Sequence, residues 1–333
     1  MHLPVFWFSV VALFWVGYLF LEGFDFGVGM LLPVVGRDET SRRVMINAIG
    51  PVWDGNEVWL IVAAGATFAA FPAWYAGLFS GAYLPLLVLL VALIGRGVAF
   101  EYRGKVDTER WRRGWDVVLT VSSWIAPLAV GLVLTTTVLG LPLDAAGDRV
   151  GSPFAMFRPD TLLGALAVAG FALLHGAAFL ALKTEGDVRD RARRVALRLA
   201  PVSVTLVAAL LLVVQVTRGH GWTWIALSVT LAAAAGAVLR LAAGRDGQAF
   251  ALLGATIVGV GVTLFGALYP DVLPSTVDAA HSLTVRGAAA TGYTLTVMTW
   301  VAAFGAPAVL VYQGWTYWVF RRRIGTRHIP PVH

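Results

Sequence analysis

Long apolar runs alternate with short polar connections along the whole chain. Nine runs approach the length of roughly 20 residues that an α-helix needs to cross a bilayer core. The pattern predicts an all-α integral membrane protein, with one polytopic domain over residues 1–333 and about nine transmembrane helices in a bundle. The expected spans are 5–32, 50–70, 75–99, 116–140, 161–182, 199–217, 222–243, 248–268 and 293–320.

The composition agrees with this interpretation. Hydrophobic residues make up 58% of the chain and charged residues 13%, against about 25% charged in soluble domains. There are no cysteines, which excludes disulfides and thiolate metal sites. The net charge of +6 comes from basic residues between the apolar runs. Their position is explained by membrane topology, so we expect no nucleic-acid partner.

The distribution of these basic residues predicts the orientation. Of the 25 Lys and Arg residues, 21 fall in connections that alternate along the chain, and four fall in the others. Short cytoplasmic connections carry an excess of Lys and Arg. The bias therefore predicts an exterior N-terminus, a cytoplasmic C-terminus and an odd number of spans. The rich segments are 33–49, 96–115, 183–198, 240–245 and 321–327.

Two polar islands interrupt the first two apolar runs. One holds Glu22 and Asp25, and the other holds Asp54 and Glu57. Residues three apart share a helix face. An ionisable group inside a span costs about 3 kcal/mol on insertion scales and usually faces a bundle interior or a water-filled path. The four carboxyl groups are therefore candidates for a proton pathway that opens to the cytoplasm, with Asp54 as its main relay. The alternative is that Asp54 and Glu57 only cap a helix start.

Several neighbours of these acids are candidates for support. Gly27 and Gly29 remove bulk beside Asp25, which admits water or a neighbouring helix. Asn56 offers neutral hydrogen bonding beside Asp54. The flanking tryptophans, Trp53 and Trp59, suit either a functional role or interfacial anchoring.

The polar connection around 96–116 mixes charges with aromatic residues. It reads either as a solvated cytoplasmic loop or as a contact surface for a partner subunit or an anionic lipid. The candidate contact residues are Arg96, Glu101, Arg103 and Trp111.

His175 lies well inside a predicted span. Membrane haem needs axial ligands such as His or Met, and no second histidine stands at a matching depth on a facing span. We therefore expect a packed, hydrogen-bonded histidine, no haem bound by this chain alone, and no metal site.

Longer motifs resemble one family, subunit II of the cytochrome bd-type quinol oxidases. The first island, Glu-Gly-Phe-Asp-Phe-Gly-Val-Gly-Met, is similar to that family's first-helix motif. The second island and its approach, Arg-Arg-Val-Met-Ile-Asn-Ala-Ile-Gly-Pro-Val-Trp-Asp-Gly-Asn-Glu-Val-Trp-Leu, resembles its strongest signature. The resemblance covers essentially the whole chain, with these and further matches at 22–30, 42–60, 100–105, 110–116, 268–270 and 294–302.

The resemblance implies a subunit of a bacterial cell-membrane enzyme that oxidises quinol, reduces dioxygen to water and takes its protons from the cytoplasm. It implies that two b-type haems and one d-type haem belong to subunit I. Subunit II would be haem-free, pair with subunit I, support a proton or oxygen route and be able to hold a structural quinone. Lipids and small accessory subunits would be further partners.

Asp25 and Asp54 match the family's intramembrane aspartates. Two positions depart from the family pattern. Glu22 stands where some members have Asp, and the connection after the sixth span is only about four residues long. The alternatives are a proton-coupled secondary transporter, which would show broken helices in both halves, and a purely structural membrane anchor with inert acids.

Overall fold

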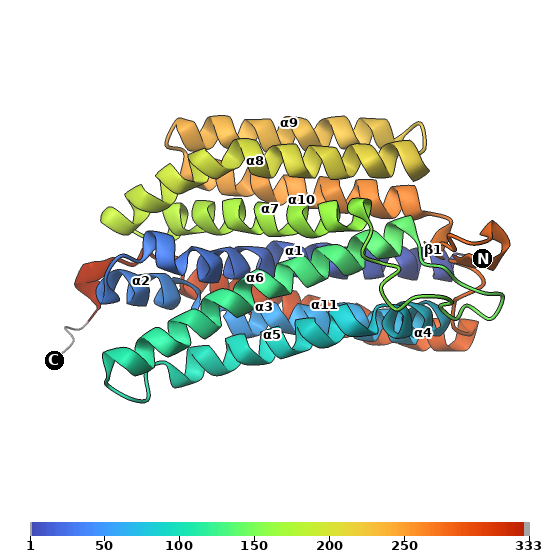
Figure 1. The fold of residues 1–333 in the computed structure, drawn as a ribbon, viewed down its shortest axis with the longest axis horizontal. Helices are drawn as coiled ribbons and strands as arrows, with labels where there is room; N and C mark the ends of the chain where they lie inside the picture. Colours follow the sequence, from blue (N-terminus) through green and yellow to red (C-terminus); the bar gives the residue numbers. More distant parts are fainter. Residues whose placement is uncertain (1, 330–333) are drawn as a thin grey trace.

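Long helices run roughly parallel through residues 2–329, the part of the chain that the computed structural model describes (Figure 1). Most are apolar around their whole circumference, as helices in a membrane are. The α-helices are α1 (Leu3–Val35), α2 (Glu39–Ile49), α3 (Trp53–Ala70), α4 (Pro72–Gly81), α5 (Tyr83–Tyr102), α6 (Glu109–Leu139), α7 (Pro159–Lys183), α8 (Asp187–Arg218), α9 (Thr223–Ala242), α10 (Asp246–Leu268) and α11 (Gly292–Val319).

Among the described residues, eight helices are long and apolar enough to cross a membrane. These are α1 and α5 to α11, and they confirm the predicted helical membrane protein. The expected span 50–70 corresponds to α3, which has 18 residues and a polar first turn and is not among the eight. The count of nine spans therefore stays a prediction.

Three expectations about boundaries were wrong. The connection expected at 183–198 is mostly helical, because α8 begins at Asp187. The span expected at 75–99 is not one helix, because α4 ends at Gly81 and α5 begins at Tyr83. The segment 33–49, expected to be a connection, contains helix α2. Asp38 caps α2, since its carboxylate accepts a hydrogen bond from the Ser41 backbone N–H at 2.8 Å. Asp38 directly follows Gly36 and Arg37, and Glu39 stands after it in the first turn. An Asp before an acidic first turn is an N-cap signal that predicts such a helix.

The described chain begins at one end of the bundle and finishes at the other (Figure 1). The end near the C-terminus also holds α2, the α5–α6 turn, the start of α8 and the α9–α10 turn. These are the connections rich in Lys and Arg, so the structure gathers them at one end as the sequence predicted. Which side of the membrane this end faces stays a prediction; we refer to it as the basic end.

A strand pair covers the opposite end. Strand β1 (Asp271–Leu273) pairs antiparallel with β2 (Leu283–Thr284). The Ser275 hydroxyl donates to the Leu143 carbonyl at 2.9 Å and ties this connection to the one after α6. The connection between the two strands contains a single turn of 3-10 helix, η1 (Ala279–His281). A second such turn, η2 (Thr326–His328), follows α11.

Close helix packing at the centre depends on glycine. Gly27 of α1 faces Gly176 of α7, and a Cβ at Gly27 would lie 2.8 Å from the Gly176 Cα and overlap the Ala172 carbonyl. A Cβ at Gly29 would overlap the Ser123 side chain of α6. Of the two roles predicted for these glycines, the structure therefore shows the approach of neighbouring helices.

Candidate functional site

Both acids of the first island are completely buried in the middle of the bundle. Glu22 and Asp25 lie on α1 and have 0% exposure. Their spacing of three residues directs both side chains toward α3 and α5, as the sequence predicted. A charge in this position requires a partner, because isolated buried ions are strongly disfavoured.

That partner is Arg96, which comes from α5 and is itself 0% exposed. Its guanidinium Nη1 pairs with Glu22 Oε1 and lies 3.5 Å from Glu57 Oε2 of α3. The guanidinium carbon lies 5.0 Å and 5.3 Å from the ring centres of Phe26 and Phe100. Arginine is favoured here because it stacks on aromatic faces while its planar head binds carboxylates.

Asn56 connects this group to α11. Its side-chain amide donates to Asp25 Oδ2 at 2.7 Å and to the Leu21 carbonyl at 3.3 Å. Its carbonyl oxygen accepts from the Tyr317 hydroxyl at 2.8 Å and from Gln313 Nε2 at 3.0 Å. Asn56 is therefore a hub between α1, α3 and α11. The sequence predicted its hydrogen bonding but not these partners.

We call Glu22, Asp25, Glu57, Arg96 and Asn56 the buried cluster. Several of its polar atoms have no hydrogen-bond partner among residues 2–329. They are Glu22 Oε2, Asp25 Oδ1, Glu57 Oε2, Arg96 Nε and Nη2, together with the nearby Tyr18 hydroxyl. Buried polar atoms of this kind are normally satisfied by internal water.

Asp54 lies apart from the buried cluster. It is exposed and makes no hydrogen bond or ion pair with another described residue. The same outward face of α3 continues through Val58 and Ile61, which are 45% and 71% exposed. The two carboxylates of the second island therefore differ, since Glu57 points inward to Arg96 while Asp54 points away from this chain.

The tryptophans of the second island pack against neighbouring helices. Trp53 stacks on Phe100 of α5 with ring centres 4.8 Å apart. Trp59 covers Gly17 of α1, where a Cβ would lie 2.6 Å from the indole, and its ring contacts Phe14. Both are half-buried, and their contacts support packing more than membrane anchoring.

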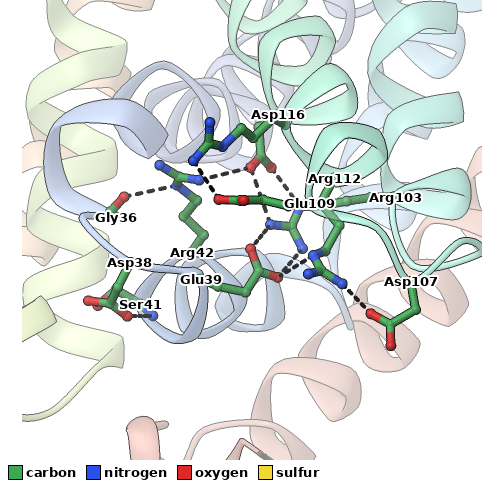
Figure 2. Close-up of polar contacts among 11 residues, drawn as sticks. Gly36, Asp38, Glu39, Ser41, Arg42, Arg103, Asp107, Glu109, Arg112 and Asp116 are labelled. Carbon is green, nitrogen blue, oxygen red and sulfur yellow. Dashed lines mark hydrogen bonds and ion pairs between the residues drawn. The ribbon is translucent and has the colours of Figure 1, made fainter. Parts of the chain in front are cut away.

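A second ionic group fastens α2 to the α5–α6 hairpin at the basic end (Figure 2). Arg103 donates from Nε to Asp116 at 2.6 Å and from Nη1 and Nη2 to both Glu39 oxygens at 3.0 and 2.8 Å. Arg42 lies 3.5 Å from Asp116, and Arg112 lies 3.7 Å from Glu39. Two-oxygen contacts of this type fix orientation as well as distance.

Ionisation at this end follows from these contacts. The backbone N–H and hydroxyl of Ser41 lower the pKa of the Asp38 carboxyl below its ordinary value, because both stabilise the anion. Burial of Arg103 disfavours its charged form, but the hydrogen bonds that it donates to Asp116 and Glu39 outweigh this and raise its pKa above the ordinary value. Arg103 is thus held as a permanent cation.

These positions correct the contact surface expected around 96–116. Arg96 cannot touch a partner or a lipid headgroup, since it is fully buried, and Arg103 is 7% exposed and paired within the chain. Of that set, Glu101 is exposed, and Trp111 is half-buried with its indole N–H donating to the Tyr102 carbonyl at 2.8 Å. Arg96 and Arg103 were misplaced because both follow an apolar run and look like loop residues.

His175 is buried among aromatic rings. It stacks on Phe250 at 4.8 Å, with Phe20, Phe24 and Phe171 at 5.5 to 5.8 Å. It is packed as predicted, but neither ring nitrogen has a hydrogen-bond partner among the described residues. The adjoining cavity, lined by Gly23 and Phe171, has a volume of only about 50 Å³.

The residues that sequence reasoning missed are Arg96 as an ion-pair partner, Tyr18, Gln313 and Tyr317. Arg96 stands 13 residues into α5, which is a signal that the arginine is intramembrane and needs a carboxylate. Gln313 and Tyr317 lie four apart in α11, so they share a face. No local feature of the sequence says which helix that face meets.

Comparisons with known proteins agree on one family. Residues 3–320 match the family model described as cytochrome bd terminal oxidase subunit II. The cytochrome bd ubiquinol oxidase subunit 2 of Bacillus subtilis is 40% identical over 324 residues, covering 96% of each chain. The Escherichia coli K12 cytochrome bd-I ubiquinol oxidase subunit 2 is 33% identical, covering 96% of this chain and 94% of its own. A chain of the bd oxidase from Geobacillus thermodenitrificans has the same fold, with a TM-score of 0.77 at 20% identity and coverage of 96% and 97%.

Proposed function

Because the chain belongs to the cytochrome bd terminal oxidase subunit II family, we propose that it is the haem-free subunit of a complex that oxidises membrane quinol and reduces dioxygen to water. The chain is a subunit of a respiratory oxidoreductase and a multi-pass protein of a bacterial membrane. In this proposal it stabilises subunit I and carries protons from the cytoplasm toward the site of oxygen reduction. The observation that supports a proton role is the buried cluster of three carboxylates around one arginine.

The proposed route uses the acids in order of depth. Asp54, exposed on α3, would be the main relay, taking up protons from the cytoplasmic side and passing them to the subunit that covers α3. Glu57, whose side chain is 23% exposed, would pass them inward, and Glu22 and Asp25 would hold them in the interior. The unpartnered oxygens Glu22 Oε2 and Asp25 Oδ1 give the interior members free acceptor positions for water. An arginine beside them keeps the carboxylates from all being neutral at once.

The outward direction of Asp54 supports a place for subunit I. Its neighbours on the α3 surface are apolar, and α11 beside it exposes Trp300 and Phe304 at 65% and 76%. A carboxylate on such a face is unfavourable against lipid. We propose that subunit I covers α3 and α11, so that Asp54 lies at the junction of the two subunits.

The surroundings of His175 support a haem-free chain. Among residues 2–329, His175 is the buried histidine, and the cavity beside it has a volume of about 50 Å³, while sites for ligands of drug size start near roughly 300 Å³. That cavity is also about a third of one known to hold benzene, roughly 150 Å³, so we assign no structural quinone to it. The haems of the complex are proposed to belong to subunit I. Quinol, lipids and small accessory subunits remain proposed partners.

The test removes titrating groups one at a time in the purified complex. Asp54→Asn and Asp25→Asn keep shape and hydrogen bonding but cannot carry a proton. Oxygen uptake with excess quinol, normalised to haem, should fall by roughly tenfold or more, the scale of general acid–base contributions. Asp54→Glu should retain more activity than Asp54→Asn. Asp187→Asn changes an exposed carboxylate at the basic end. It is the matched control and should leave the rate of oxygen uptake unchanged.

Three results separate the proposals. Full activity in both Asn variants would reject a proton route through these residues and leave the chain a structural anchor. Loss of haem together with activity would show that the acids hold the subunits together. Absence of haem absorbance from the chain purified without its partner is expected, and stoichiometric haem there would refute the haem-free assignment.

A further inference from the structure

A second cavity, of about 300 Å³, opens at the basic end between α2, α7, α10 and α11. Its walls are apolar, formed largely by Phe179, Phe250 and Phe320. Its rim is cationic and carries Lys183, Arg321 and Arg323. We call this space the basic-end cavity. It is separate from the buried cluster, although Tyr317 borders both.

The walls are built by tertiary contacts. The Phe250 ring lies 5.9 Å from that of Phe179 and stacks on His175 at 4.8 Å. The segment after α11 is fixed in place, since Ile324 N–H donates to the Lys183 carbonyl at 2.9 Å and the Glu185 N–H donates to the Ile324 carbonyl at 3.1 Å. The cavity therefore has a defined shape on both sides.

The rim charges are incompletely neutralised. Among the described residues, Lys183 makes no side-chain hydrogen bond or ion pair. Arg321 stacks on Trp318 at 4.4 Å and donates to its carbonyl, but it meets no carboxylate of residues 2–329. Arg323 lies 3.6 Å from Asp246, which also binds Arg189 at 2.6 Å. No Asp or Glu of the described chain lines the cavity, so its rim favours an anion.

From this geometry we propose that the basic-end cavity binds one anionic glycerophospholipid. The phosphate would lie between Lys183 and Arg321, and the first part of the acyl chains would pass along Phe179, Phe250 and Phe320. A volume of about 300 Å³ corresponds to about ten waters at roughly 30 Å³ each. That accommodates a phosphoglycerol group and the first methylenes, with the remaining chain lying on the outer surface of the bundle.

Two physical features favour a phospholipid over other occupants. Basic residues near the membrane surface attract anionic headgroups, and long cationic side chains extend toward that level while their stems stay on apolar surface. A neutral quinone would leave the rim charges unused. A free phosphate ion would leave the three phenylalanine walls unused. The lipid is the ligand class that matches both halves of the cavity.

The test measures lipid retained by the purified complex. Native mass spectrometry is performed on the complex exchanged into detergent with phosphatidylglycerol, with phosphatidylcholine, or with inorganic phosphate alone. We expect one phosphatidylglycerol per complex. Lys183→Gln with Arg321→Gln should weaken it by about 30-fold, which is about 2 kcal/mol, the attraction of two basic residues for anionic lipid. The control, Arg110→Gln with Arg198→Gln, removes the same charge from exposed positions outside the cavity.

A variant that keeps the charges guards against unfolding as an explanation. Ala48 lines the cavity and is 3% exposed, so Ala48→Leu should displace the lipid while haem content and subunit ratio stay normal. Equal retention in the cavity and control variants would overturn the proposal. The proposal would also be overturned if phosphatidylcholine is retained as well as phosphatidylglycerol, if inorganic phosphate alone is retained at this site, or if quinone is found in place of lipid.

Discussion

Removing the positive charge of Arg96 should destabilise the complex more than any exposed charge change. Arg96 and Glu22 are both 0% exposed and are paired with each other. Glu57 is 3.5 Å away, and Asp25 lies within the same buried cluster. Arg96→Met preserves length and apolar contact with Phe26, but it leaves three carboxyl groups without their cation.

The magnitude follows from the burial. Breaking a buried ion pair by removing one partner costs about 3–5 kcal/mol, because the remaining charge is uncompensated. Unfolding entropy of about 2.1 cal/mol/K per residue, over 333 residues, gives about 0.7 kcal/mol/K. The melting temperature should therefore fall by about 4–7 °C. Adding Glu22→Gln removes the orphaned charge and should recover about 2 kcal/mol, or about 3 °C.

The assay is thermal unfolding of the purified complex, followed by the loss of the monodisperse peak in size-exclusion chromatography. All variants are heated at the same rate, because unfolding of such complexes is often irreversible. Arg110→Met, which changes an exposed arginine in the first turn of α6, is the control. The reasoning is refuted if Arg96→Met melts with the control, or if the double variant melts no higher than Arg96→Met.

Three further outcomes follow from the structure. Gly27→Ala should weaken assembly, because its Cβ overlaps α7. A Cβ at Gly114 on α6 meets open space, so Gly114→Ala should be silent in the same melting assay. Asp38→Ala should lower the free energy of unfolding by about 1 kcal/mol, because the N-cap of α2 is lost. Folding lowers the pKa of Asp38, so the stability difference between the two proteins should be present above about pH 4 and vanish as the pH falls below it. Reporters fused after Arg323 and within 144–158 should read cytoplasmic and exterior; reversal at both sites would reject the orientation.

Hydrophobic pattern was enough to place most of the helices. Apolar runs of spanning length define α7, α9, α10 and α11 closely, because nothing else in such a run competes with helix formation, whereas α6 and α8 begin earlier, in polar sequence. The inward direction of Glu22 and Asp25 was also predictable, since a carboxylate in the middle of a span needs a protected site. These conclusions depend only on local sequence and the properties of the bilayer.

The rest depended on which helices meet. Asp54 and Glu57 are three apart, yet Glu57 turns to Arg96 while Asp54 remains exposed. That difference arises from the rotation of α3 against α1 and α5, which the pattern of α3 alone does not determine. The break at 81–83 and the capping of α2 by Asp38 are local, and closer attention to turn and cap residues predicts the second.

The exposed position of Asp54 also bears on why a separate subunit carries these acids. Within this chain, Asp54 faces outward beside Val58 and Ile61, whereas Asp25 is sealed behind Asn56 and α11. An interior acid with no surface relay exchanges protons slowly with water. A surface acid with no interior partner has no further group to which it can pass a proton. In the proposed route, Asp54 at the surface of α3 and Asp25 in the interior on α1 belong to a path that is completed only when a partner covers α3. Docking would then shield Asp54 from lipid and direct its proton. Polar substitutions at Val58 and Ile61 on the same face should impair assembly, whereas Asp54→Asn should slow proton delivery while assembly stays normal.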